Sequence, residues 1–142
     1  MFVLGPPSTL QIADVRTGKA EVVADNIGRS LHRIPGTRFA SFVHREPSGE
    51  YWIKQLDTST KKIDPLVKVV DGNSERDMTW MPDGKTILMS AGTKVFSWTR
   101  GASGWSEVFD GASHQLGAIS RLTVSPTGDA VAIVVAEPST RK

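Results

Sequence analysis

The stretch that decides the fold is residues 77–89, DMTWMPDGKTILM, where a short alternating run passes through Pro82, Asp83 and Gly84 into a second apolar run. Proline presets φ at the first corner of a turn, and glycine accepts the positive φ that follows. Two such runs around such a turn are typical of an antiparallel β-hairpin. The stretch therefore predicts two neighbouring strands.

The hairpin pattern occurs three times along the chain. Residues 30–42, SLHRIPGTRFASF, and residues 121–133, RLTVSPTGDAVAI, align with residues 77–89, and the three prolines are 47 and 44 residues apart. The segments between the hairpins also repeat, as strand, polar turn and strand, over residues 10–23, 51–63 and 94–109. Each period thus holds four antiparallel strands, which is the content of one β-propeller blade.

The order of the strands predicts how the blades are divided. With the strands of a blade named a to d, the chain reads c-d, a-b-c-d, a-b-c-d, a-b. We expect one all-β domain over residues 1–142, with blades at about 29–73 and 74–119 and a third blade made of 120–137 combined with 9–27. Residues 1–4 are apolar and predict a further strand, which would duplicate the last b strand.

About three blades make half of a six-bladed ring, fewer than the four to eight of usual closed propellers. Exposed strand edges invite pairing, so something must cover the open ends. Two arrangements satisfy this need: a homodimer in which two chains close one ring, or the tail of a longer chain whose other blades lie upstream. We favour the homodimer, because the two ends of the chain are complementary halves of a blade.

The repeat resembles the TolB-like propeller family. That family's recurrent signature is a strand, then Ser-Pro-Asp-Gly-Lys, then an apolar strand, and residues 80–88 and 124–129 are similar to it. Residues 14–19, DVRTGK, resemble the Asp-x-x-Thr-Gly-Lys ending of the family's later strand pair. The resemblance implies six blades, a periplasmic or secreted setting in many relatives, and roles in protein binding or as accessory domains of hydrolases.

Composition and charge exclude several classes of protein. The net charge of +2 arises from 17 basic and 15 acidic residues, which is too small an excess to indicate nucleic-acid binding. Hydrophobic residues make up 39% and charged residues 23%, which argues against disorder and against membrane insertion. The chain has no cysteine, so disulfides and thiolate metal sites are absent, and its first residues do not have the pattern of a signal peptide. Both the cytosol and an exported compartment are compatible with these features.

No catalytic or metal-binding constellation is evident in the sequence. The string GASG at 101–104 lacks the nucleophile-elbow pattern, and its small residues suit a hairpin loop around Ser103. His32, His44 and His114 are too far apart for a local metal motif. The loop 71–77 places oxygen ligands at alternate positions, but Arg76 and Pro82 stand where an EF-hand needs Gly and Glu. We therefore expect a non-enzyme without cofactor or metal.

The best candidates for ligand binding lie where the a strands would meet at the mouth of a central channel. Four arginines recur near the starts of these strands and predict a positive rim, although solvated turns would also explain them. The four tryptophans predict core packing between blades, and Trp80 is the best candidate for an aromatic ligand contact. The arginines are Arg29, Arg33, Arg76 and Arg121, and the channel-mouth candidates are Arg33, Arg76, Arg121, His32, Trp80 and Asp77.

These observations leave three hypotheses for function. The first is a non-catalytic scaffold, assembled as a homodimer, that binds a protein, a peptide or a small anionic ligand at the channel mouth. The second is a C-terminal fragment or accessory propeller domain of a larger hydrolase or lyase. The third is a scaffold without a present ligand. The fold alone does not choose among them.

Overall fold

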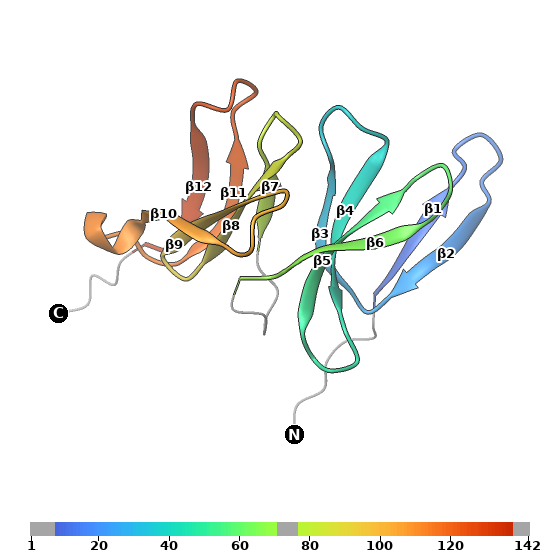
Figure 1. Cartoon of the computed structure of the whole chain (residues 1–142), viewed down its shortest axis with the longest axis horizontal. Coiled ribbons are helices and arrows are strands. Elements are labelled where there is room, and N and C mark those ends of the chain that lie inside the picture. Colours follow the sequence, from blue (N-terminus) through green and yellow to red (C-terminus); the bar gives the residue numbers. More distant parts are fainter. Residues whose placement is uncertain (1–7, 71–76, 138–142) are drawn as a thin grey trace.

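The computed structural model describes residues 8–70 and 77–137, and these residues form four separate antiparallel sheets. Figure 1 shows the sheets following one another like the blades of an open fan. Two complete four-stranded sheets lie in the middle, and a two-stranded sheet lies at each end. The predicted all-β fold and the strand order c-d, a-b-c-d, a-b-c-d, a-b are confirmed.

The strands of each sheet are consecutive in sequence. The first sheet holds β1 (Thr9–Ala13) and β2 (Ala20–Asp25). The second holds β3 (Ile27–Arg33), β4 (Phe39–Arg45), β5 (Tyr51–Asp57) and β6 (Ile63–Lys68). The third holds β7 (Met78–Trp80), β8 (Thr86–Ala91), β9 (Lys94–Thr99) and β10 (Ser106–Asp110), and the fourth holds β11 (Ile119–Val124) and β12 (Val131–Val135).

Helix is limited, within the described residues, to one 3-10 turn, η1 (Gly111–His114). Asp110 caps this turn, because its side chain accepts a hydrogen bond from the Ala112 N–H. The residues before and after η1 carry the chain from the outer strand β10 back to the first strand of the last sheet, β11. No helix in the described ranges has the length and hydrophobicity that crossing a bilayer requires.

The three repeated hairpins have one common register. His32 pairs with Ser41 across β3 and β4, Thr79 with Leu88 across β7 and β8, and Thr123 with Ala132 across β11 and β12. Each pair lies at the same distances from the hairpin proline, which is Pro35, Pro82 or Pro126. Residues at the same distance from these prolines are therefore equivalent, and their surroundings can be compared directly.

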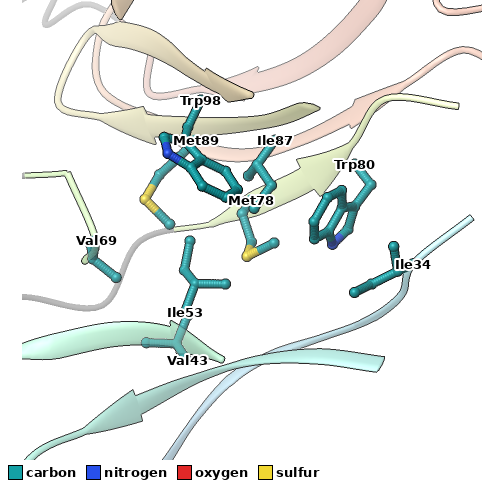
Figure 2. Packing of buried hydrophobic residues seen from close by; sticks show 9 residues of the cluster. All are labelled: Ile34, Val43, Ile53, Val69, Met78, Trp80, Ile87, Met89 and Trp98. Atoms are coloured by element: carbon teal, nitrogen blue, oxygen red, sulfur yellow. The ribbon is translucent and has the colours of Figure 1, made fainter. Parts of the chain in front are cut away.

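Three apolar layers hold neighbouring sheets together, because each strand turns alternate side chains toward the preceding and following sheet. The largest layer lies between the two complete sheets (Figure 2). Its buried members are Ile34, Val43, Ile53, Val69, Met78, Trp80, Ile87, Met89 and Trp98. A second layer joins the third and fourth sheets through Leu88, Val95, Ile119 and Leu122. A third joins the first and second sheets through Leu10, Phe42 and Leu56.

Candidate functional site

The first strands of successive sheets, β3, β7 and β11, lie beside one another: β3 contacts β7, and β7 contacts β11. A pocket of about 370 Å³, which we call the inner pocket, opens where they meet. It brings together three of the predicted channel-mouth residues, His32, Asp77 and Arg121. The rest of its lining comes from the last hairpin: Leu122, Thr123, Ala132, Ile133 and Val134.

Asp77 is held in place by the next sheet. Its Oδ2 accepts a hydrogen bond of 2.8 Å from the Leu122 N–H of β11, and its carbonyl accepts one of 3.1 Å from the Ser90 N–H. Hydrogen bonds to a carboxylate are among the stronger ones in proteins. Asp77 therefore joins the third and fourth sheets and fixes one negative charge in the inner pocket.

His32 lies half-buried on β3, facing the same pocket. Burial lowers the pKa of His32 from its ordinary value, because a charged imidazolium loses hydration there, and the nearby Asp77 carboxylate opposes this shift. The imidazole is therefore neutral at neutral pH. It can then donate one hydrogen bond and accept another.

Arg121 supplies the positive charge of the inner pocket. It is exposed on β11, and among the described residues it forms no ion pair. A guanidinium is always charged and offers donors in a planar fork that suits carboxylate or phosphate. The pocket thus holds one fixed carboxylate, one neutral imidazole and one available guanidinium.

The other predicted site residues do not join the inner pocket. Arg33 follows His32 on β3, so its exposed side chain points to the opposite face of the sheet. Arg76, residues 1–4 and residues 71–76 of the polar loop lie outside the described residues, as does the side chain of Arg29. The continuous arginine rim is therefore reduced, in the described part of the chain, to Arg121.

Trp80 requires a correction, because it is not available to a ligand. Its side chain is only 4% exposed, and its Nε1–H donates a 2.8 Å hydrogen bond to the Ser41 Oγ of the preceding complete sheet. The Arg100 guanidinium lies over the ring, 5.3 Å from its centroid. Trp80 is a core residue that also satisfies a buried hydroxyl, and the inner pocket has no aromatic lining.

The other tryptophans divide between core and surface. Trp98 is buried in the central layer, and Trp105, in the loop before β10, packs against that layer and donates from Nε1 to the Lys68 carbonyl. Trp52 lies in a shallow outer pocket of about 400 Å³. The carboxylates of this outer pocket are already paired, Glu46 with Lys54 at 2.8 Å and Glu50 with Lys68 at 2.7 Å.

In the described ranges, no three His, Asp or Glu side chains gather as a metal ion would require. One wall of the inner pocket, formed by Thr123, Ala132 and Val134, was not predicted from the sequence. These residues alternate with Leu122 and Ile133, which pack inward. Alternation alone could have placed them on the open face of the last hairpin.

Comparisons with known proteins support the fold. No family model matches the chain, and no curated protein matches it. Among solved structures, the crystal structure of TolB from Acinetobacter baumannii is similar, with a TM-score of 0.71 and 19% sequence identity over 94% of this chain. The match covers 33% of the TolB chain. At this identity the likeness establishes the fold alone, and the chain has the fold of a partial TolB-like β-propeller.

Proposed function

We propose that this chain is a non-catalytic binding scaffold whose ligand site is the inner pocket. One observation carries the proposal: His32 on β3, Asp77 directly before β7 and Arg121 on β11 line the same pocket. Such convergence of a few polar groups on a concave surface is typical of binding sites. The propeller framework would hold these groups in fixed positions on its strands.

The chemistry of the pocket favours an anionic group, such as a carboxylate or a phosphate, on a small molecule or at a peptide terminus. Arg121 would bind that group through charge-assisted hydrogen bonds. Asp77, held by the Leu122 N–H, would repel an anion placed on its side and so restrict it to the Arg121 side. A hydroxyl or amine of the same ligand could donate to Asp77 or His32.

Binding of anionic probes tests this proposal. We would titrate the protein with citrate, with inorganic phosphate and with a short acidic peptide, and follow the amide resonances of Leu122 and Thr123 by NMR. The variant Arg121→Ala should weaken binding by about tenfold or more, because a hydrogen bond to a charged group contributes about 1.5–3 kcal/mol.

The matched control is Arg16→Ala, in the turn between β1 and β2, where the side chain is 87% exposed. This variant should bind like the wild type. Equal affinity in the Arg121 variant, or no response to any of the three probes, would refute the inner pocket as an anion site. Since the resonances belong to the pocket itself, binding elsewhere would not imitate the expected result.

We further propose that a second copy of the chain completes the ring, so that the scaffold acts as a homodimer. The chain spans 33% of the solved TolB, and its two ends carry different halves of a blade. The mass of the protein in solution tests this: a dimer is expected, and a monomer at all concentrations would refute it. The titration of the inner pocket is a separate measurement, made at one fixed protein concentration, because a second copy would cover Val134 in the wall of that pocket.

The second candidate is an accessory propeller of a larger hydrolase or lyase. The same observation favours it, namely that the chain aligns with only 33% of the solved TolB chain. Upstream blades or an enzyme domain in the same reading frame would establish this candidate. Their absence from the reading frame would exclude it.

A further inference from the structure

The two ends of the fan expose apolar side chains whose equivalents elsewhere are buried. Val43 and Val134 each lie eight residues after a hairpin proline, on β4 and β12. Val43 is fully buried between sheets, whereas Val134 is 56% exposed. The residue type and strand position are the same, so the difference arises because residues 8–70 and 77–137 provide no sheet beyond β12.

The opposite end shows the same effect on its first complete sheet. Leu31 on β3 is equivalent to Met78 on β7 and Leu122 on β11. Met78 is fully buried and Leu122 is 6% exposed, because each packs against the preceding sheet. Leu31 is 55% exposed. Within the described part of the chain the preceding sheet has only β1 and β2, the outer strands c and d, and no a-b hairpin from this part covers Leu31.

An apolar pocket lies beside β12, where the described residues provide no complementary c-d hairpin. About 260 Å³ of space lies between the third sheet and β12, lined by Leu88, Val95, Val108, Phe109, Val131 and Ile133. Val108 is 56% exposed, and it is equivalent to Val23 on β2 and Leu66 on β6, which both pack against apolar layers. A c-d hairpin beside β12 would cover Val108 in the same way.

The hairpin corners repeat this difference. A Cβ placed on Gly84 would lie 2.5 Å from the Pro35 carbonyl oxygen, and one on Gly128 would lie 3.2 Å from Pro82 Cδ. Each corner therefore rests on the proline of the preceding hairpin. At Gly36 a Cβ would meet nothing within 4 Å. No hairpin proline among the described residues lies beside Gly36. Pro126 is the hairpin proline on which neither of the other two corners rests.

We propose that two copies exchange half-blades, so that β12 of one copy pairs antiparallel with β1 of the other and the two chains form one composite four-stranded sheet at each junction. The described residues carry a c-d hairpin, β1 and β2, at one end of the fan and an a-b hairpin, β11 and β12, at the other, and these two halves together make up one four-stranded sheet. A second copy is therefore the occupant that fits both faces. This inference rests on the proposed homodimer and adds its geometry.

The two complete sheets fix the register of the proposed pairing. Ala40 pairs with Leu56 across β4 and β5, and Ile87 pairs with Trp98 across β8 and β9. The equivalent of Ala40 and Ile87 on β12 is Val131. The equivalent of Leu56 on β1 is Ala13, since Asp14 and Asp57 follow them and each caps the next turn in the same way. Val131 of one copy therefore lies opposite Ala13 of the other.

A disulfide tests this register, because the chain contains no cysteine. Directly opposite strand residues have Cα atoms about 4.5–5.5 Å apart, which a disulfide can span. The double variant Ala13→Cys/Val131→Cys should form a covalent dimer under mild oxidation. The control Thr9→Cys/Val131→Cys moves one cysteine four residues along β1, beyond reach, and should remain unlinked. Circular dichroism would verify that both variants are folded.

The outcomes separate the register from the homodimer itself. Covalent dimers from the Ala13 pair alone support the half-blade exchange. A dimeric mass without that crosslink, or with equal crosslinking of the control, overturns the proposed register and leaves self-association intact. A monomeric mass with no crosslink overturns the exchange together with the homodimer.

Discussion

At the scale of single residues, Asp57 connects the end of β5 to Arg38, which directly precedes the neighbouring strand β4. It ends β5, and its two carboxylate oxygens accept hydrogen bonds of 2.8 Å each from Arg38 Nε and Nη2. Oδ1 also accepts from the Ser59 and Thr60 N–H groups of the following turn. The hydrogen bonds from Arg38, before all other causes, hold the pKa of Asp57 well below its ordinary value.

This depressed pKa predicts a defined dependence of stability on pH. A carboxyl whose pKa is lower when folded stabilises the protein above its unfolded pKa of about 4 and loses that contribution as the pH falls further. Asp57→Asn should therefore lower the melting temperature at neutral pH and flatten its decrease between about pH 5 and pH 3. Thermal unfolding across this range measures both effects.

Arg38→Met is the matched second variant, because it removes the partner and leaves the carboxylate. If the pair acts as described, the loss at neutral pH in the double variant should be smaller than the sum of the two single losses. Strict additivity, or an unchanged acid slope in Asp57→Asn, would contradict the role given to the pair.

Trp80 shows what residue-level reasoning could and could not predict. Its place on an inner strand followed from the repeat, and core packing was the expected default for the tryptophans. The choice of Trp80 as a ligand contact failed, because the Ser41 hydroxyl, 39 residues away in sequence, receives its N–H inside the core. Such a contact depends on how two sheets face each other, which the pattern of one strand does not contain.

At the scale of elements, the hairpin corners bring neighbouring sheets into contact. Gly84 has φ = 69°, a left-handed conformation that disfavours a side chain, and it also lies close to the Pro35 carbonyl. Gly18, in the turn between β1 and β2, has φ = 78° and open space around a Cβ. A side chain at Gly18 would therefore meet only an unfavourable backbone conformation. A side chain at Gly84 would meet the same conformation and also a steric clash.

Substitution by alanine at these two corners should give different losses of stability. Gly18→Ala should cost about 1–2 kcal/mol from the left-handed backbone alone. Gly84→Ala should cost more, because the new methyl group must also displace the backbone at Pro35. Urea unfolding of the two variants measures the difference, and equal losses would show that the corner contact contributes nothing.

The elements were the most predictable part of the molecule. Pro-Asp-Gly at 82–84 and the equivalent corners at Pro35 and Pro126 predicted the positions of the hairpins. The spacing of the three prolines predicted the period of four strands. The 3-10 turn at Gly111–His114 was not predicted, since four residues are too few to show a helical hydrophobic periodicity. The inner pocket was half-predicted: strand starts indicated His32, Asp77 and Arg121, and the alternation of side chains along β3 would already have separated Arg33 from them.

At the scale of the whole molecule, the exposed apolar faces at the two ends of the fan should make folding depend on dimer formation. A partner that binds only the folded chain stabilises it by mass action, so the melting temperature of a homodimer rises with protein concentration. All the large apolar side chains that are exposed among the described residues, except Val15, lie on the first three or last three strands. The wild type should therefore melt at higher temperature as its concentration increases.

Val134→Lys should remove this dependence without unfolding the chain. The side chain is 56% exposed in the single copy, so a lysine there remains hydrated. In the closed ring the same position would be buried like Val43, and an unpaired buried charge costs about 3 kcal/mol or more. The closed ring contains this position twice, once at each junction, so association should weaken by about 10,000-fold, giving a monomer whose melting temperature does not change with concentration. Val15→Lys, at a 95% exposed turn position, should behave like the wild type. If Val134→Lys keeps a dimeric mass and a concentration-dependent melting temperature, the face that carries Val134 is not the surface through which the ring closes.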